Sequence, residues 1–441
     1  MRSRLKKSLT ASLVVATVVA WTIDASAAEK EHSPPKARLL TVWVMPNGPD
    51  DNVRTFQDLV QPFVDANPGI KIEAVVVPWG EALSRIEAAL AGRGPAPDVT
   101  QLGTTWVAAV AATGQLLDLK GKYEENLFPP QILAATEVAD EPKHSGKRFA
   151  LPWLVDTRAI YFNKDYCKQA GVNPEKDFAT WNSFHKALRK LRQVVYQGAP
   201  VAPLGVTLSN WNVIHNLSSW IWGAGGGFVG NGKEPGIASP QTLTGIEYYV
   251  GLAREGLLSP IAEQADQTFV SRMLREGSIA ATISYPIGPV PDDKFGIAPL
   301  PAGPQGRVTF LGGSVLAVFK SSEHPEEAVA LLRYLSTEAA QLQYSMITGG
   351  LVAAAGEYDE LLLQLDPIRR AFVTQMKYGR AYPSIAVWGE IEVVLRDGLS
   401  ALWVKATGPA PYDRATTQRQ LQDMQEKIDV ILQQRAQSAA K

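Results

Sequence analysis

The amino-acid sequence predicts an α/β fold in two domains, and three observations support this prediction. Strand-like and helix-like segments alternate over residues 39–112, and a second alternation runs from Ala159 to about Phe310. Alternation at this spacing favours mainly parallel sheets flanked by helices. Beyond an N-terminal leader, roughly 414 residues remain, which is more than a single hydrophobic core usually supports.

The first alternation begins with an apolar strand that stops at the Pro/Gly-rich segment 46–49. A helix with apolar residues at helical spacing follows, and the turn Asn67-Pro68-Gly69 separates it from the next strand. In such sheets ligands bind beyond the carboxyl ends of the strands. The expected strands are 39–45, 70–77 and one opening at 97, and the expected helices are 52–66, 81–91 and 105–112.

Within the second alternation, a glycine run at 223–227 marks a tight or flexible loop. The last part of the chain, 366–441, is expected to be helical with a break at the Pro-rich segment 408–411. The expected helices are 181–195, 211–222, 242–254, 269–277, 325–335 and 337–344, and the expected strands are 204–207, 279–285 and 310–319.

The N-terminus has the three parts of a secretory signal peptide. Arg2, Arg4, Lys6 and Lys7 precede an apolar run at 9–23, and Ala25-Ser26-Ala27 gives a small-residue cleavage site. The apolar run is too short for a transmembrane helix, so we expect cleavage near Ala27 and no insertion in the membrane. Residues 28–37 are expected to form a disordered polar leader.

Composition narrows the class of protein further. The whole chain has net charge −1 and the leader carries +3, so the remainder is about −4, which argues against nucleic acid as a partner. The only cysteine, Cys167, allows no disulfide within the chain and no lipid anchor at the cleavage site, which favours a soluble periplasmic protein. The five histidines show no metal-ligand spacing, so we expect no metal and no cofactor.

The tract 146–165 carries the strongest functional signal. Trp153 and Asp156 lie three residues apart in an apolar segment that begins at Pro152 and reads as a strand. A buried carboxylate there is costly unless it is paired or faces a cavity. An aromatic face beside a hydrogen-bonding carboxylate suits a sugar, whose ring has apolar C–H faces and a hydroxyl rim.

Several local patterns, in the same order, resemble the extracellular solute-binding proteins of sugar ABC importers, of the maltose-binding type. The resemblance spans about residues 38–435. It rests on Phe63–Ile70 with its Asn-Pro-Gly turn, Ala96–Val99, Gly114–Leu119, the tract ending Tyr161-Phe162-Asn163-Lys164-Asp165, Ala179–Phe184, Phe295–Pro301, Gly312-Gly313-Ser314 and His324–Ala328.

The resemblance implies a two-lobed periplasmic binding protein of the type II kind, with three crossings between its lobes. We expect the crossings near 153–156, 310–313 and 377–383. Lobe one would comprise 38–153 plus 313–376, and lobe two 156–310 plus 380–441. The protein would capture a sugar or oligosaccharide by closure of the cleft and deliver it to the membrane permease of an ABC importer. It would act as a monomer in the periplasm.

The resemblance also implies a set of ligand-binding residues, each with a structural alternative. Asp156 would bind sugar hydroxyls, or form a salt bridge with Arg158. Trp153 beside it would either stack on a sugar ring or pack within the hinge. Thr104 and Thr105 follow a strand and begin a helix, where free backbone N–H groups bind polar atoms, and Trp106 would cover the ring.

Further candidates lie at strand ends and helix starts. Asn47 follows the first strand, whereas Trp43 within it is either a ligand residue or core. Trp211 in the second domain is favoured over Trp222. Tyr285 and Trp388 occupy positions where the family often has an aromatic ligand residue. Gly313 allows close approach of a ligand or supplies hinge freedom.

Two other functions compete with this interpretation. One is a binding protein for a non-sugar polar solute such as a polyamine, an anion or a glycerol phosphate. The other is a secreted glycoside-active enzyme, which would need two carboxyl groups across a cleft. No hydrolase or metalloprotease motif is present, so we expect no enzyme activity and no catalytic residue.

Overall fold

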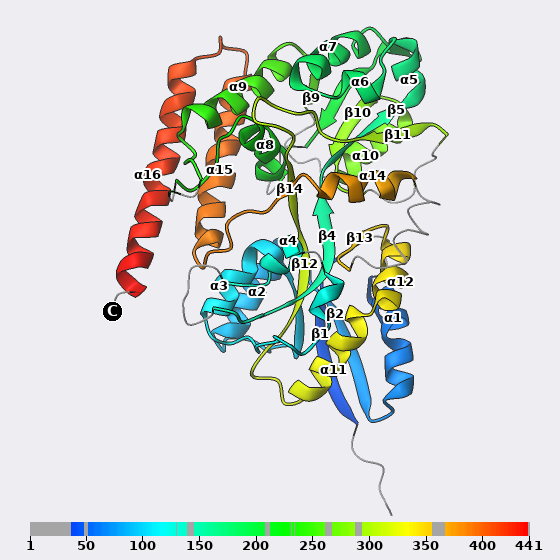
Figure 1. Ribbon diagram of the computed structural model, residues 1–441, viewed down its shortest axis with the longest axis vertical. Coiled ribbons are helices and arrows are strands. Elements are labelled where there is room, and N and C mark those ends of the chain that lie inside the picture. Colours follow the sequence, from blue (N-terminus) through cyan, green and yellow to red (C-terminus); the bar gives the residue numbers. More distant parts are fainter. Residues whose placement is uncertain are drawn as a thin grey trace, which may run out of the picture. The chain divides into compact units, whose positions relative to one another are not determined.

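Two large β-sheets with helices packed against them organise the chain (Figure 1). In this computed structural model the described residues are 37–47, 52–128, 130–138, 145–207, 212–230, 232, 234–260, 267–286, 293–354 and 367–439. The described residues from Ala37 onward form one unit. The expected signal peptide and most of the polar leader lie outside the described residues.

The first sheet has the strand order β13-β4-β12-β3-β1-β2, with β14 paired to the start of β12. β1 is parallel to β2 and to β3, whereas β12 is antiparallel to β3 and to β4. Its strands are β1 (Arg38–Val44), β2 (Ile70–Val76), β3 (Val99–Gly103), β4 (Leu151–Thr157), β12 (Thr309–Val318), β13 (Leu351–Val352) and β14 (Gly379–Arg380).

Helices of different lengths lie beside the first sheet. α1 packs on β2 and α12, while α11 packs on β12 and β4. These elements are α1 (Asn52–Ala66), α2 (Trp79–Leu90), the 3-10 helix η1 (Thr104–Trp106), α3 (Val107–Ala112), η2 (Glu125–Leu127), α4 (Pro130–Ala134), α11 (Pro325–Ser336) and α12 (Glu338–Thr348).

The second sheet has the order β11-β5-β10-β8-β9. β10 is parallel to β8 and antiparallel to β5. The strands are β5 (Ala159–Asn163), β8 (Ala202–Val206), β9 (Leu258–Pro260), β10 (Ile279–Ser284) and β11 (Phe295–Ala298). The accompanying elements are α5 (Lys164–Gln169), α6 (Pro174–Asp177), α7 (Trp181–Leu191), the hairpin β6 (Val195–Tyr196) with β7 (Ala199–Pro200), α8 (Asn212–Gly223), α9 (Pro240–Arg254) and α10 (Gln267–Glu276).

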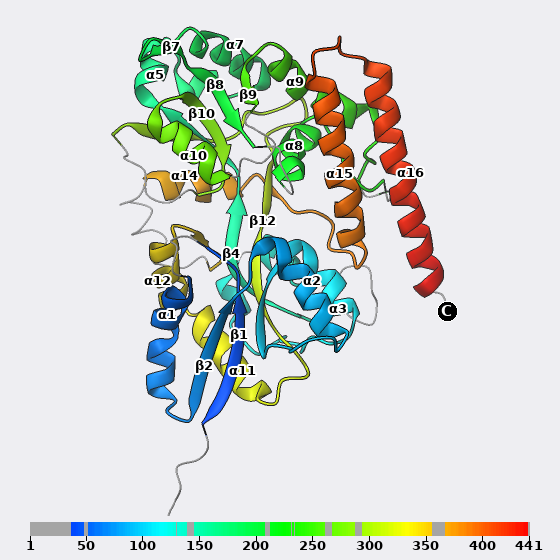
Figure 2. The same ribbon diagram turned by 180° about the vertical axis from the view of Figure 1, so that it is seen from behind.

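Three helices complete the chain: α14 (Pro367–Met376), α15 (Trp388–Thr407) and α16 (Arg414–Ala439). α15 packs against α16, α8 and α9, and its first turns also contact η1 and α3 of the first sheet (Figure 2). α14 contacts β11 and β5 as well as β12 and β4. The predicted lobe boundaries, including the one at residue 376, stay predictions.

The predicted α/β architecture with two sheets flanked by helices is confirmed. Fewer neighbouring strands are parallel than the sequence predicts. β12 and β4 are antiparallel partners in the first sheet, and β5 is antiparallel to both its neighbours in the second. β4 is followed almost at once by β5, so the chain passes from one sheet to the other with only Arg158 between them.

Local signals explain where the helices begin and end. α1 has the predicted bounds. α7 begins at a capping box between Thr180 and Ser183, which satisfies the free N–H groups of its first turn. It ends at Leu191, four residues earlier than expected, because 195–200 form a hairpin. Gln197 and Gly198 both have positive φ there, as a two-residue hairpin turn requires.

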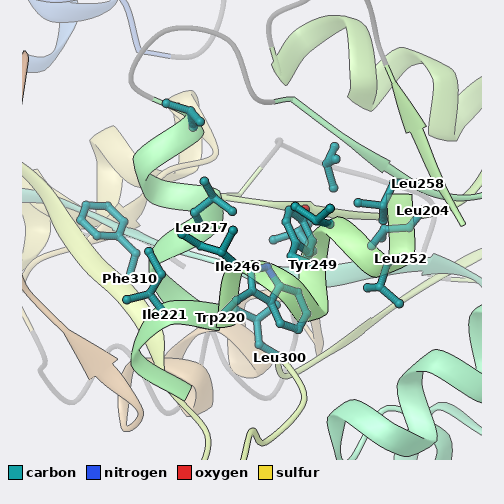
Figure 3. Close-up of a cluster of buried hydrophobic side chains, with 14 of the residues drawn as sticks. Leu204, Leu217, Trp220, Ile221, Ile246, Tyr249, Leu252, Leu258, Leu300 and Phe310 are labelled. Atoms are coloured by element: carbon teal, nitrogen blue, oxygen red, sulfur yellow. The ribbon is translucent and has the colours of Figure 1, made fainter. Parts of the chain in front are cut away.

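The core beside the second sheet is built around Trp220, which is buried on α8 (Figure 3). Its ring stacks on Tyr249 of α9 at 4.9 Å between ring centroids. Gly245 lets the two helices approach closely, since a Cβ there would lie 2.3 Å from the carbonyl oxygen of Trp220. This packing fixes α8, whose first turns reach the site described next.

Among the described residues no helix is both long enough and apolar enough to cross a membrane. Cys167 is buried in α5, and burial raises the pKa of its thiol to about 12.

Candidate functional site

A cavity of about 410 Å³ lies where elements of the two sheets meet. Its walls come from the ends of β1 and β3, from β4 and β12, and from α8, β10 and α15. A cavity of this size is in the range that holds small organic ligands. It is lined by Pro46, Asn47, Trp79, Gly103, Thr104, Thr105, Trp106, Leu154, Val155, Asp156, Arg158, Asn212, His215, Tyr285, Pro286, Phe310, Gly313, Ser314, Thr348, Gly350 and Glu392.

Asp156 and Arg158 form a salt bridge on the floor of the cavity. The Arg158 Nη2 group donates to Asp156 Oδ2 at 3.0 Å, and the Arg158 side chain is 2% exposed against 28% for Asp156. Burial raises the pKa of Asp156, and the charge of Arg158 opposes that rise. Asp156 Oδ1 and the Nε and Nη1 atoms of Arg158 have no hydrogen-bond partner among the described residues. The pair therefore keeps unused hydrogen-bonding capacity beside the cavity.

Arg158 is held in place from both sides. Its backbone N–H donates to the Thr309 hydroxyl at 3.2 Å, and that hydroxyl donates to the Arg158 carbonyl at 3.0 Å. Its guanidinium lies 5.0 Å from the centre of the Tyr285 ring, a cation–π distance. Tyr285 follows β10, so the second sheet positions this aromatic ring at the cavity wall.

Aromatic rings form another wall of the cavity: Trp79 begins α2 after β2, and Trp106 ends η1 after β3. Trp106 packs closely on Gly103, since a Cβ at position 103 would lie 3.3 Å from its ring. Trp79 lies 5.8 Å from Trp106 between ring centroids, tilted by 59°, and its Nε1 donates to the Pro46 carbonyl at 3.0 Å. Trp79 is 37% exposed. The two rings offer a partly open apolar surface next to the Thr104 and Thr105 hydroxyls.

Glu392 enters the cavity from α15. Glu392 is 3% exposed, and the Thr105 hydroxyl donates a hydrogen bond to its Oε2 at 3.4 Å. Burial raises the pKa of Glu392 to about 7, against smaller lowering effects from Thr105, Trp388 and Arg396. The hydrogen bond connects α15, which packs beside the second sheet, to η1 of the first sheet.

His215 of α8 packs against two rings, Phe310 and Tyr382, at the cavity. It stacks on Phe310 at 4.2 Å between ring centroids, and its Nδ1 is 3.0 Å from the Tyr382 hydroxyl. Burial, with the charge of Arg158, holds the pKa of His215 well below its usual value. A neutral imidazole therefore contributes hydrogen bonding rather than charge.

Asn47 is fixed at the cavity edge by a polar network beneath it. Its Nδ2 donates to the Met45 carbonyl at 2.8 Å, and its backbone N–H bonds to Asn52 Oδ1 at 2.7 Å. Gln101 below it donates to the Ser314 hydroxyl at 2.9 Å. The amide thus has a fixed orientation toward the cavity wall.

Gly313 permits a close approach of β12 to β4. It has φ of 138°, and a Cβ there would lie 1.9 Å from the carbonyl oxygen of Leu154. A side chain at this position would push apart the two strands that carry Asp156 and Ser314.

The structure brings together seven of the eleven predicted ligand residues. Asp156, Thr104, Thr105, Trp106, Asn47, Tyr285 and Gly313 all line the cavity. Their role in binding stays a prediction.

The other four predicted residues are not among the cavity lining. Trp153 is 1% exposed and its ring contacts Tyr344, and Trp43 is buried in the core cluster beside β1. Trp388 is fully buried and stacks on Tyr382 at 4.9 Å between ring centroids. Trp211 lies outside the described residues. An aromatic ring can pack in a hydrophobic core or stack on a sugar, and its position in the sequence does not distinguish these two roles.

Sequence reasoning missed polar residues of the cavity, two of which come from helices. Arg158 was considered only as a partner for Asp156, and neither His215 nor Glu392 was considered as a cavity residue. A signal for Glu392 existed: it lies four residues after Trp388, and such pairs share one face of a helix. No signal marked His215, because its place depends on how α8 packs. No group of three potential metal ligands is found in the described part of the chain.

Comparisons with known proteins agree with this geometry. The family described as bacterial extracellular solute-binding protein matches residues 49–342. A putative binding protein of Brucella abortus is 23% identical over 393 residues, covering 86% of this chain and 89% of that protein. The diacetylchitobiose-binding protein of Streptomyces coelicolor is 24% identical over 397 residues, covering 85% and 87%.

Among solved structures, the GacH receptor of Streptomyces glaucescens superimposes with a TM-score of 0.76 at 21% identity, covering 89% of this chain and 98% of that one. This likeness extends over both sheets and shows a common fold. The chain belongs to the bacterial extracellular solute-binding proteins.

Proposed function

We propose that this protein binds a sugar or oligosaccharide in the cavity between its two sheets. The observation that carries the proposal is the pairing of aromatic rings with the Asp156–Arg158 salt bridge across one cavity. Trp79 and Trp106 match the apolar face of a sugar ring, while the salt bridge and the Thr104 and Thr105 hydroxyls match its hydroxyl rim.

Relatives that are named for carbohydrates support the proposal. One binds diacetylchitobiose, another is named an arabinooligosaccharide-binding protein, and the GacH receptor was solved in complex with acarbose. Others are named for sn-glycerol 3-phosphate, so the class of solute varies among relatives. The aromatic wall of this chain favours a ring-shaped solute over a small phosphate ester.

We further propose that capture is a hinge motion of two lobes, joined at 153–156, 310–313 and 377–383. Ligand would favour the closed form because it touches both lobes only there. The protein would then act as a monomer in the periplasm and present its closed form to an ABC importer permease, after cleavage of the signal peptide near Ala27.

Replacement of Trp79 by alanine tests the aromatic wall. Calorimetric titration of the mature protein with a panel of mono- and oligosaccharides identifies a ligand, and Trp79→Ala should then weaken binding roughly three- to tenfold. The protein should still fold, since Trp79 is 37% exposed. Phe269→Ala is a matched control, because Phe269 on α10 is 39% exposed and is not among the residues lining the cavity. Equal affinity of both variants and wild type would remove this wall from the site.

We propose binding without turnover. A glycoside hydrolase needs a pair of carboxyl groups placed across the scissile bond, and Asp156 is engaged by Arg158. Chromatography of the sugar after long incubation with the protein should recover it unchanged. Released reducing ends that depend on Asp156 or Glu392 would establish the enzyme instead.

A further inference from the structure

Glu392 is a buried carboxyl group of the cavity that has no ion-pair partner among the described residues. It lines the cavity while being 3% exposed, and its hydrogen bond from Thr105 is a bond to a neutral hydroxyl. Asp156, the other carboxyl group of the cavity, is neutralised by Arg158 at 3.0 Å.

The groups around Glu392 compensate its charge only in part, with Arg396 as the one cation that lowers its pKa. Arg396, one turn further along α15, is bound to Asp397 at 2.7 Å and is partly exposed. His215 is neutral, and η1 and α3, which pack against the start of α15, contain only threonine, tryptophan, valine and alanine. The titratable or charged groups that interact with it or share its cavity are Arg396 on its own helix, Tyr382 before that helix, His215 on α8 and the Asp156–Arg158 pair.

A buried carboxyl group without an ion-pair partner is costly to ionise, and groups with pKa values shifted by burial are concentrated at functional sites. Burial holds the pKa of Glu392 at about 7, so close to neutral pH the group is divided between its acid and its ionised form. A ligand that brings a positive charge would bind the ionised form and remove this cost. A ligand that brings a negative charge would meet repulsion.

We propose that the solute carries a protonated amino group, as a free amino sugar does, and that Glu392 is the residue that pairs with it. This inference rests on the proposed sugar-binding function and names its substrate class. Trp106 follows Thr105 directly and lines the same wall, with Trp79 at 5.8 Å. Aromatic faces attract cations, so the neighbourhood of Glu392 suits an ammonium group beside a sugar ring.

The proposal fixes the sign of the pH dependence. A bound ammonium group lowers the pKa of the carboxyl group that it pairs with. Affinity for an amino sugar therefore rises with pH as Glu392 ionises and falls again once the amine loses its proton. Affinity for a neutral sugar gains nothing from ionisation of Glu392.

Three disaccharides of one ring type and linkage test the proposal by calorimetry: the β-1,4-linked disaccharide of glucosamine, cellobiose and N,N′-diacetylchitobiose. The amine of the first is titrated in parallel, so that only pH values at which it is protonated are compared. We expect the amino disaccharide to bind wild type about tenfold more tightly than either neutral sugar at the highest pH at which its amine is still protonated. Glu392→Gln should abolish that preference while retaining affinity for the neutral sugars.

Glu390→Gln is the matched control, since Glu390 lies on the same helix turn, is exposed and is not among the cavity-lining residues. It should keep the preference of wild type. Equal binding of the three sugars, or a preference for the amine that survives Glu392→Gln in a folded variant, would overturn the inference and leave sugar binding intact. If none of the three sugars and no other saccharide of the panel binds, the proposed function itself fails.

Discussion

Glutamine at position 392 should make the protein more stable than wild type above neutral pH and not below the ordinary pKa of glutamate. Glutamine keeps the shape of the side chain and its hydrogen bond to Thr105, but it cannot ionise. Burial raises the pKa of Glu392 from 4.5 to about 7, so between these values the folded state binds more protons than the unfolded state.

The sign and size of the effect follow from this difference. An acid whose pKa is raised by folding contributes stability that is complete below its unfolded pKa and is lost as pH rises through its folded pKa. At about 1.4 kcal/mol per pKa unit, the loss amounts to at most about 3 kcal/mol. With an entropy of unfolding of about 2 cal/mol/K per residue, the corresponding difference in Tm is about 4 °C.

Thermal unfolding of wild type and Glu392→Gln, followed by circular dichroism between pH 4.5 and pH 8.5, measures this difference. The two melting temperatures should lie close together at the acid end and separate steadily through neutral pH, with the variant higher. Glu390→Gln should show no such separation. A constant difference across the whole range, or a variant that loses stability as pH rises, would refute the burial of a carboxyl group without an ion-pair partner.

Two further predictions concern positions outside this helix. Gly313→Ala should lower the free energy of unfolding, measured by urea titration, by at least about 2 kcal/mol, because the new Cβ would meet the Leu154 carbonyl at a positive φ. Gly251→Ala is the control: position 251 faces open space on α9, so alanine there should raise the free energy of unfolding slightly. A tolerated alanine at 313 would contradict the close approach of β12 to β4. Cys167 should react slowly with a thiol reagent in the folded protein and fast in urea, because burial raises its pKa to about 12; rapid reaction of the native protein would show an accessible thiol.

Much of the fold could be predicted because its elements carry local signals. The helix at 52–66 follows from apolar spacing, and α7 begins at a threonine whose cap the sequence displays. The antiparallel pairing of β12 with β4 could not be predicted, because it joins segments about 150 residues apart and depends on how the two sheets are connected. The hairpin at 195–200 was not predicted, because its turn needs a positive φ at Gln197, and glutamine rarely adopts this conformation.

The candidate site was predictable where it lies at strand ends. Asn47, Thr104, Thr105, Trp106 and Asp156 occupy the positions at which an α/β sheet presents side chains to a ligand. Trp388 and Glu392 show the limit of such reasoning. Both begin α15, but the packing of α15 on its neighbours buries the tryptophan and turns the carboxyl group to the cavity.

The central claim is that a sugar lies between the aromatic wall and the Asp156–Arg158 pair. A crystal structure of the protein grown with the tightest saccharide of the calorimetric panel tests it most directly. We predict density for a sugar ring stacked on Trp79 or Trp106, with a hydroxyl within hydrogen-bonding distance of Asp156 or Arg158. A saccharide bound elsewhere on the protein, with this cavity holding only solvent, would contradict the account.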